Sequence, residues 1–174
     1  MAINLKDYIV DVNDFPKKGI VFKDITPVFE NNKAFQKAID EMASLVEEDD
    51  FDKIICADAR GFLVGSALAY KLNKGLILAR KPGKLPRPGY ESHYELEYGS
   101  NSLVISVDSI KKGDRLLLTD DLLATGGSAQ CMYDLAKGAG GEIVSAVFLV
   151  ILESLEGETK LKNLGIKVDA PIRY

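Results

Sequence analysis

The sequence contains little cysteine, and the cysteines it has are not arranged for cross-linking or for metal binding. Cys56 and Cys131 lie inside apolar segments and lack CxxC spacing. We therefore expect two small buried thiols, with neither a disulfide nor a metal site. The single histidine, His93, has no partner visible in the sequence, and we expect a surface residue without a catalytic role.

An excess of basic residues is also absent. The formal net charge is −4 and the isoelectric point is about 5.1. This acidic balance gives no general attraction to nucleic acid or to an anionic membrane, although a local basic cluster can still hold a small anion. The expected partners are therefore small molecules, with no nucleic acid and no membrane.

Long apolar runs, targeting segments and repeats are missing as well. The apolar run Ile143–Leu152 has ten residues, about half of what a helix needs to cross a bilayer. The amino-terminal stretch MAINLKDYIVDV carries charges where a secretory signal has its apolar core, which predicts a cytoplasmic protein. Without repeats or long linkers, and with 47% apolar residues, one domain over residues 1–174 is expected.

The periodicity that is present predicts an α/β fold. Apolar residues at helical spacing cover 33–46, and strand-length apolar runs then alternate with helical stretches. Right-handed βαβ units place such strands side by side, so we expect a parallel twisted sheet with helices on both faces. Ligands bind at the carboxyl ends of the strands in sheets of this kind. The expected strands are 53–57, 76–79, 115–119 and 143–152, and the expected helices between them are 62–72 and 127–138.

The stretch LLLTDDLLATGGSA, residues 116–129, stands at one of these strand ends. Its small residues let a ligand approach the backbone, and the helix that follows offers free N–H groups and a positive dipole end. The loop is therefore a candidate cradle for a phosphate monoester, with two hydroxyl groups as further donors. The residues of this predicted phosphate loop are Ala124, Thr125, Gly126, Gly127 and Ser128.

Two adjacent carboxylates, Asp120 and Asp121, precede the loop. They would repel a phosphate, but they are good acceptors for the two hydroxyl groups of a vicinal diol. A diol beside a phosphate describes ribose 5-phosphate. The alternative is a solvated acidic turn followed by glycine. Other nucleotide motifs do not compete, because no GxxxxGK[ST] loop occurs and the glycines of GAGGE (138–142) follow a helix instead of a strand.

The same stretch resembles the phosphoribosyl-diphosphate signature of the type I phosphoribosyltransferases, and its DDLLATGG variant resembles the adenine-specific members. The hypoxanthine–guanine members are expected to carry a DTG-type loop there. Xanthine members are expected to show EASG where this chain has residues 58–61. The similarity covers most of residues 14–155, through DFPKKGIVFKDITPVF (14–29), ARGFLVGSALAYKL (59–72), ARKPGKLP (79–86) and YELEYGSNSLVI (94–105).

This resemblance implies adenine and 5-phosphoribosyl 1-diphosphate as substrates, and AMP and pyrophosphate as products. It also implies a homodimer and Mg²⁺ as cofactor. That ion would be held mainly by the phosphates of the substrate and by water, without a dedicated metal site in the protein. Displacement at the anomeric carbon passes through an oxocarbenium-like transition state, so cations for the leaving group and a lid against water are required.

Four cationic residues are expected to bind the diphosphate. Arg60 matches the pyrophosphate loop of the family, which often carries a non-proline cis peptide, here at Asp58–Ala59 or Ala59–Arg60. The other three cluster in ARKPGK as Arg80, Lys81 and Lys84. A solvated basic turn is the alternative for this cluster.

A flexible hairpin lid is expected at about residues 81–99, a stretch rich in proline, glycine and aromatic residues. The resemblance assigns Glu97 to the imidazole side of the purine, as proton acceptor or hydrogen-bond partner, and lets Tyr98 close over the site. The alternative for Glu97 is the end of an ordinary hairpin.

The purine would be recognised by the segment GIVFK (19–23). The resemblance implies contacts through the backbone around Val21 and Lys23 and a stack of the base on Phe22, for which a core aromatic is the alternative. Leu152 matches an apolar wall of the base pocket. Two rival functions remain open: transfer to another base, and a ligand-sensing regulator on the same fold.

Overall fold

The computed structural model describes residues 3–95 and 100–174, and contacts divide the chain into two compact units between Glu41 and Met42. The first unit contains a short antiparallel pair of strands, β1 with β2. That the two units form one domain, as the sequence predicts, stays a prediction. The elements of the first unit are η1 (Leu5–Tyr8), β1 (Val10–Asn13), β2 (Val21–Asp24), α1 (Thr26–Glu30) and the start of α2 (Asn32–Ser44).

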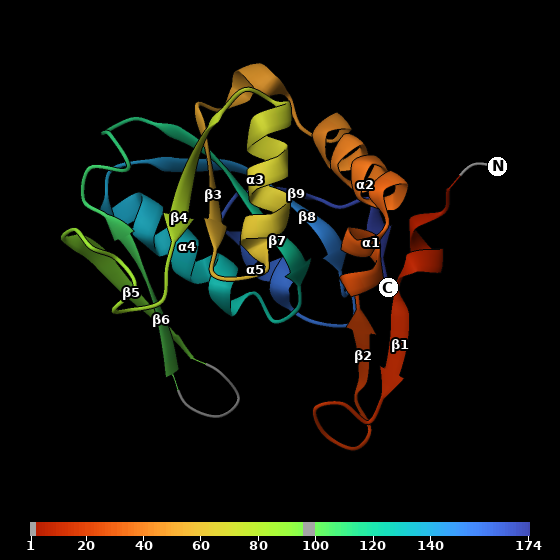
Figure 1. The fold of residues 1–174 in the computed structure, drawn as a ribbon. Coiled ribbons are helices and arrows are strands. Elements are labelled where there is room, and N and C mark those ends of the chain that lie inside the picture. Colours follow the sequence, from red (N-terminus) through yellow and green to blue (C-terminus); the bar gives the residue numbers. More distant parts are fainter. Residues whose placement is uncertain (1–2, 96–99) are drawn as a thin grey trace. The chain divides into compact units, whose positions relative to one another are not determined.

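The second unit is built on a parallel sheet with strand order β10-β8-β7-β3-β4, to which β9 adds by pairing with β8 (Figure 1). Each described pair in this sheet is parallel, as expected for βαβ units. Its elements are η2 (Glu48–Asp50), β3 (Lys53–Ala57), α3 (Gly61–Lys71), β4 (Gly75–Ala79), β5 (Gly89–Glu95), β6 (Ser100–Ser106), β7 (Arg115–Leu123), α4 (Gly127–Gly138), β8 (Glu142–Ile151), α5 (Gly157–Asn163), β9 (Lys167–Asp169) and β10 (Ile172–Arg173).

Helices cover both faces of the sheet. Successive side chains of a strand point to opposite faces, so they contact different helices. Ile55 and Ala57 of β3 join one buried cluster with Met132 of α4. Cys56, which lies between them, faces α3, where a Cβ atom on Gly65 would come within 2.6 Å of its sulfur. The predicted α/β class with a parallel sheet and helices on both faces is confirmed, and both cysteines are buried free thiols, as expected.

Strand β7 is longer than the sequence predicts. The expected strand ended at Thr119, but pairing with β8 continues to Leu123, and Asp120 is paired with Phe148. The neighbouring strand β8 is buried along its second half, so it offers ladder partners beyond the point where the apolar residues of β7 stop. The two aspartates therefore lie within a central strand instead of in the turn after it.

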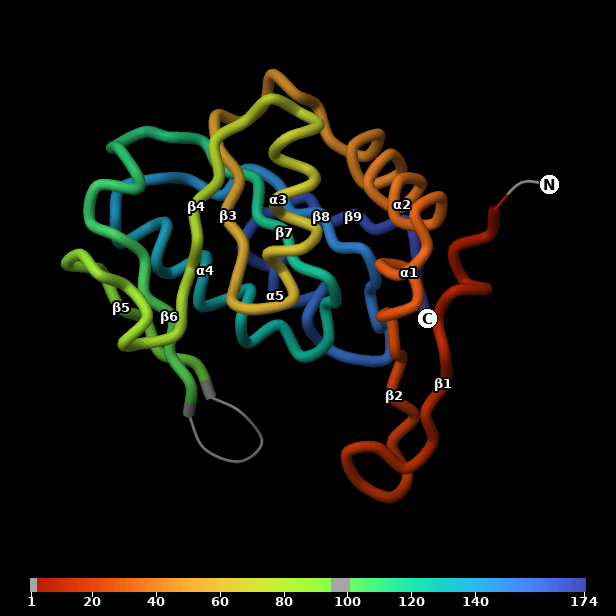
Figure 2. Tube along the Cα trace, viewed as in Figure 1, coloured from red at the N-terminus to blue at the C-terminus, as the bar shows by residue number. Residues whose placement is uncertain are grey.

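The chain leaves the sheet after β4 and forms the antiparallel hairpin β5–β6 before it returns into β7 (Figure 2). Pairing is regular from Gly89 opposite Ser106 to Glu95 opposite Ser100, within the stretch where the sequence predicted a hairpin. The buried side chains of Leu103 and Ile105 anchor β6. Residues 96–99 lie outside the described residues, so the mobility of a lid stays a prediction.

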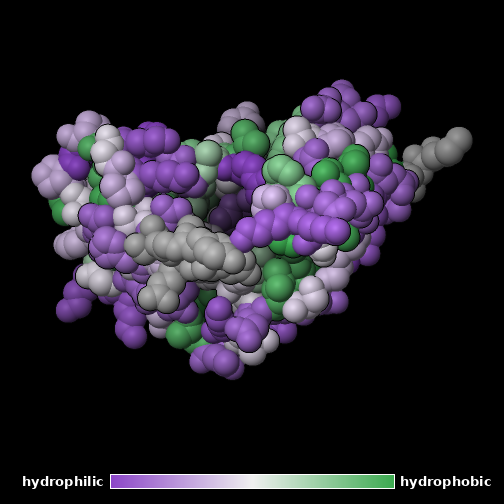
Figure 3. All heavy atoms as spheres, turned by 90° about the horizontal axis from the view of Figure 1, so that it is seen from below, coloured by the Kyte–Doolittle hydropathy of each residue, from purple (hydrophilic) through white to green (hydrophobic). Residues whose placement is uncertain are grey.

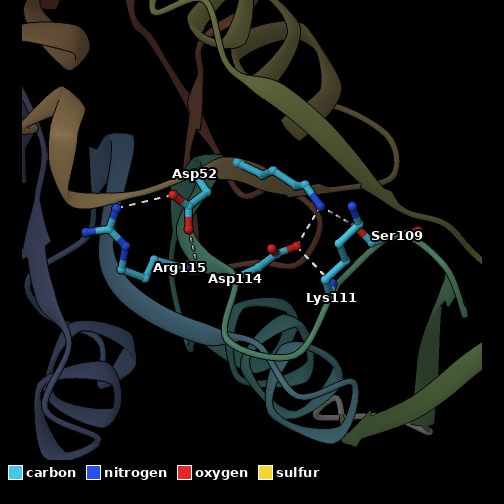
Figure 4. A network of polar contacts seen from close by, with 6 residues as sticks. Asp52, Ser109, Lys111, Asp114 and Arg115 are labelled. Atoms are coloured by element: carbon cyan, nitrogen blue, oxygen red, sulfur yellow. Dashed lines mark hydrogen bonds and ion pairs between the residues drawn. The ribbon is translucent and has the colours of Figure 1, made fainter.

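A polar network joins the segments next to the amino-terminal ends of β3 and β7 (Figure 4). Lys53 Nζ donates to Asp114 Oδ2 over 2.6 Å, and the same carboxylate oxygen accepts from the backbone N–H of Lys111. The Lys53 hydrogen bond, followed by that of Lys111, holds the pKa of Asp114 below its ordinary value. Close by, the backbone N–H and the guanidinium of Arg115 donate to Asp52 and lower its pKa.

Replacing Asp114 by Asn is expected to lower the free energy of unfolding by about 1–2 kcal/mol at neutral pH, because a charge-assisted hydrogen bond is lost. The folded pKa of this carboxyl is depressed, so its contribution is present above the ordinary pKa of aspartate and disappears as the pH falls through the lowered value. Thermal unfolding at neutral and at acidic pH tests this. Equal unfolding temperatures of wild type and variant at neutral pH would contradict it.

Candidate functional site

The site of interest lies where the parallel strands β3, β4 and β7 end, at the edge from which three loops leave the sheet. In the view of Figure 1, β3 runs downward to this edge, and Figure 3 looks at the molecule from below. Hydrophilic side chains dominate that view, with small apolar areas between them. Such an edge suits a polar, charged ligand.

The predicted phosphate loop forms a concave site. Gly126 has φ +81°, a conformation that side chains disfavour, and it caps α4, which begins at Gly127 without a side-chain hydrogen bond at its first turn. A cavity of about 190 Å³ lies against residues 122–128 and Tyr94 of β5. Free backbone N–H groups at a helix start, in a concave site of this size, can hold a phosphate group. A larger cavity of about 320 Å³, between Lys137 and Glu142, lies at the other end of the sheet.

The aspartate pair of β7 is buried beside this loop. Asp120 and Asp121 are only 8% and 4% exposed, and the backbone N–H of Asp121 donates to Asp120 Oδ1. Burial, and then the neighbouring charge of Asp121, raise the pKa of Asp120 well above its ordinary value. Helix α3 begins against it, because a Cβ atom on Gly61 would lie 2.5 Å from Asp120 Oδ1.

One carboxylate oxygen of Asp121, Oδ2, has a charged neighbour but no hydrogen bond among the described residues. Arg60 Nε lies 2.8 Å from Asp121 Oδ2, an ion-pair distance. That contact does not have hydrogen-bond geometry, and no other hydrogen bond to this buried oxygen is found among the described residues. Because buried polar atoms are normally hydrogen-bonded, the oxygen is a ready acceptor for a ligand hydroxyl.

The loop after β3 carries Arg60, which contacts this pair, and Asp58, which contacts two more of the predicted diphosphate residues. The peptide bond Asp58–Ala59 is cis, at one of the two expected positions. The side chain of Asp58 is 5% exposed and forms ion pairs with two cations. Arg80 Nε lies 3.4 Å and Lys84 Nζ 3.5 Å from Asp58 Oδ2. Arg60, Arg80 and Lys84 are thus all gathered around the carboxylates of this edge, whereas Lys81 is exposed on the loop surface.

The residues predicted to bind the purine belong to both units of the chain. Val21, Phe22 and Lys23 belong to β2 of the first unit, where Phe22 packs edge-on against Phe15 and Lys23 Nζ lies 2.6 Å from Asp11. Leu152 follows β8 in the second unit and donates its N–H to the carbonyl of Leu123, which places it beside the end of β7. Their contact with a base stays a prediction, and Glu97 and Tyr98 lie outside the described residues.

Four residues at this edge were not predicted from the sequence. Gly61 and Gly157 approach other backbone or carboxylate atoms so closely that a side chain would not fit, and Tyr94 lines the phosphate-loop cavity. Lys160 donates to the carbonyl of Thr125. Gly157 and Lys160 lie in ESLEGETK, which follows strand β8, and a glycine in the short connection after a predicted strand was the one local signal that could have pointed to a close approach.

Among the described residues, no group of three or more His, Cys, Asp or Glu side chains is arranged to hold a metal ion. Mg²⁺ usually keeps several waters and binds through one or two carboxylates and the phosphates of a substrate. The carboxylates of the aspartate pair, next to a loop that suits a phosphate, fit an ion that binds mainly through the phosphates of a ligand and through water. Within the described part of the chain, no helix is long and apolar enough to cross a membrane.

Comparison with known proteins agrees with this geometry. The sequence model of the phosphoribosyl transferase domain family matches residues 28–169. The chain is therefore a phosphoribosyltransferase, in agreement with the aspartate pair and the phosphate loop at the edge of its sheet. Adenine phosphoribosyltransferase of Thermotoga petrophila is 50% identical over 165 residues, which are 95% of this chain and 97% of that protein. The chain belongs to the adenine phosphoribosyltransferase family.

Solved structures support the same assignment. The crystal structure of adenine phosphoribosyltransferase from Thermoanaerobacter pseudethanolicus has a TM-score of 0.92 at 45% identity, with 98% of each chain covered. The enzyme of Saccharomyces cerevisiae, crystallised with an imino-altritol bisphosphate and adenine, has a TM-score of 0.85 at 35% identity and covers 97% of this chain and 94% of its own. The predicted family and fold are therefore confirmed.

Proposed function

We propose that this protein transfers the 5-phosphoribosyl group from 5-phosphoribosyl 1-diphosphate to adenine, giving AMP and pyrophosphate in purine salvage. The observation that carries the proposal is the buried aspartate pair directly beside an anion-binding loop, in a chain that is about half identical to adenine phosphoribosyltransferases. Carboxylates next to a phosphate cradle match the diol and the 5-phosphate of one ribose.

In this proposal the phosphate loop, Ala124 to Ser128, holds the 5-phosphate through backbone N–H groups and the hydroxyls of Thr125 and Ser128. Asp120 and Asp121 accept hydrogen bonds from the ribose 2- and 3-hydroxyls. Support comes from the cavity at the loop and from Asp121 Oδ2, for which the described residues offer no hydrogen bond. Both anchors fix the ribose, so the anomeric carbon is held in one orientation for attack.

The diphosphate leaves toward the cations Arg60, Arg80, Lys81 and Lys84. In the structure three of them contact Asp121 or Asp58, so binding of the donor exchanges these carboxylates for phosphate oxygens. The family generally uses Mg²⁺, and we include it as a cofactor bound mainly by the substrate phosphates and water. When bound, it would neutralise charge that develops on the leaving group.

For the base, we assign the backbone around Val21 and Lys23, a stack on Phe22 and an apolar wall at Leu152. Glu97 accepts a proton or hydrogen bond at the imidazole side, and Tyr98 covers the site when the lid of residues 81–99 closes. Closure excludes water that would otherwise capture the oxocarbenium-like centre. A homodimer and a cytoplasmic location stay predictions from the sequence.

Incubation of the purified protein with the diphosphate donor, Mg²⁺ and one base at a time tests the proposal. Formation of AMP from adenine, with much slower reaction of hypoxanthine, guanine and xanthine, is the expected result. A preference for another base would mean that the protein transfers the phosphoribosyl group to that base instead of to adenine. No turnover with any base, despite tight donor binding, would favour a ligand-sensing role.

A further inference from the structure

The phosphate loop is in direct backbone contact with the start of α5, a segment outside the glycine-rich stretch. The N–H of Gly157 donates to the carbonyl of Ala124 over 3.0 Å. A Cβ atom on Gly157 would lie 2.3 Å from that carbonyl oxygen, and one on Gly126 would lie 2.9 Å from Gly157 Cα. Neither position can carry a side chain unless the loop moves. The loop conformation therefore depends on Gly157 as well as on its own glycines.

A second contact follows less than one turn later in α5. Lys160 Nζ donates to the carbonyl oxygen of Thr125 over 3.0 Å, while its ion pair with Glu156 is looser at 3.7 Å and exposed to solvent. The carbonyl of Thr125 and the N–H of Gly126 belong to the same peptide group. A cation on the carbonyl oxygen polarises this group, so its N–H becomes a stronger donor.

The contact of Lys160 with the loop matters because the phosphate would bring negative charge into the loop cavity. A phosphate monoester carries about −1.5 to −2 charges near neutral pH. The described residues that line the loop cavity, Tyr94 and 122–128, include no lysine or arginine. The loop therefore meets the anion with neutral donors and the dipole of α4, and Lys160 adds positive charge from behind the loop.

We propose that α5 supports the phosphate loop, with Gly157 and Lys160 as positioning residues for the 5-phosphate of the donor. Gly157 fixes the backbone path of the loop, and Lys160 strengthens its anion binding through the carbonyl of Thr125. This role rests on the proposed function. It means that Gly157 and Lys160 contribute to donor binding although neither residue contacts the substrate.

Lys160→Met is the first test, with Lys160→Arg as the conservative variant and Lys162→Met as the matched control. Lys162 lies on the same helix and pairs with Glu158 instead of the loop, so the control removes the same charge without the contact. Calorimetry with ribose 5-phosphate should show affinity reduced about 3- to 10-fold in Lys160→Met. Lys160→Arg and Lys162→Met should stay close to wild type.

Steady-state kinetics separates positioning from a general structural effect. In Lys160→Met, KM for the diphosphate donor should rise by the same factor, while kcat at saturating donor and KM for adenine stay unchanged. The unfolding temperature should hardly move, because Lys160 is an exposed side chain. Equal losses in Lys160→Met and Lys162→Met, or unchanged ribose 5-phosphate affinity in Lys160→Met, would overturn the role of Lys160.

Gly157→Ala tests the backbone contact, and Gly138→Ala is its control. A Cβ atom on Gly138 meets no other atom within 4 Å, so this substitution adds the same methyl group without a clash. Ribose 5-phosphate affinity should fall in Gly157→Ala and stay constant in Gly138→Ala, and equal affinities in both would overturn the role of Gly157. Wild-type protein that binds ribose 5-phosphate but forms no AMP would refute the proposed function alone, since these binding comparisons would still hold.

Discussion

Replacing Glu97 by glutamine is expected to lower kcat by about 10²–10⁴, the range for a positioned acid or base. The substitution keeps the shape of the side chain but removes the carboxylate that we assign to the imidazole side of adenine. Affinity for the diphosphate donor should change much less, since the phosphate loop and the aspartate pair bind that substrate elsewhere. Steady-state kinetics with adenine, together with calorimetry of donor binding, measures both quantities.

Glu91→Gln is a suitable control for this experiment. Glu91 belongs to the same hairpin, on β5, and its carboxylate accepts a hydrogen bond from Ser102 of β6. The variant thus loses a carboxylate of the hairpin without touching the assigned catalytic position, and its kcat should remain near that of wild type. Wild-type turnover in Glu97→Gln would leave that residue as part of an ordinary hairpin and shift the catalytic role to the cations.

Replacing both Asp120 and Asp121 by asparagine should weaken donor binding by a few kcal/mol, since hydrogen bonds to charged groups contribute about 1.5–3 kcal/mol each. The fold should persist, because the backbone pairing of β7 is unaffected by the change. Calorimetry with the diphosphate donor measures the loss. Asp114→Asn is the control, since it removes a carboxylate at the opposite end of β7 and should leave donor affinity unchanged. Unchanged affinity in the double variant would exclude the diol-binding role.

The single variant Asp120→Asn should be more stable than wild type at neutral pH, by about 2–4 °C in unfolding temperature for each kcal/mol gained. Burial and the charge of Asp121 raise the folded pKa of Asp120, so its charged form is costly in the folded protein. A raised pKa gives stability that is present below the unfolded value and lost as the pH rises through the folded value. The advantage of the variant should therefore shrink as the pH is lowered, and thermal scans across pH would measure it. A lower unfolding temperature of the variant at neutral pH would contradict the expectation.

The gain in stability and the loss in donor binding come from the same carboxylates. In the structure their charges repel each other and Arg60 pairs with Asp121; in the proposed complex the two carboxylates accept hydrogen bonds from the ribose hydroxyls. Sites that are costly in the free protein and useful in the complex are a common reason for a trade-off between stability and activity.

Local features of the sequence predicted several elements with their observed bounds. Helix α4 covers 127–138 as expected, because the glycine pair at its start permits the left-handed turn at Gly126 and the apolar residues that follow keep helical spacing. Strand β3 covers 53–57, where β-branched residues lie in a run of strand length. The parallel sheet then follows from the alternation of such strands with helices.

Features that depend on neighbours distant in sequence could not be predicted in this way. Strand β7 ends at Leu123 instead of at the predicted Thr119, because β8 supplies its ladder partners there. Regular pairing from Gly89 to Glu95 is decided by the opposite strand β6, and local glycine and proline content did not prevent it.

The sequence by itself therefore determined the fold class, the loop that suits a phosphate and the carboxylates that suit a diol, since these depend on residue types at short spacing. Only the tertiary structure decided how the site is assembled: that Arg60 lies against Asp121, that Arg80 and Lys84 share Asp58, and that α5 supports the loop. These contacts join residues from 22 to 61 positions apart in the chain, at distances set by the packing of strands and helices. Local periodicity carries no information on such distances, because it fixes which face a side chain takes and not which distant residue meets it there.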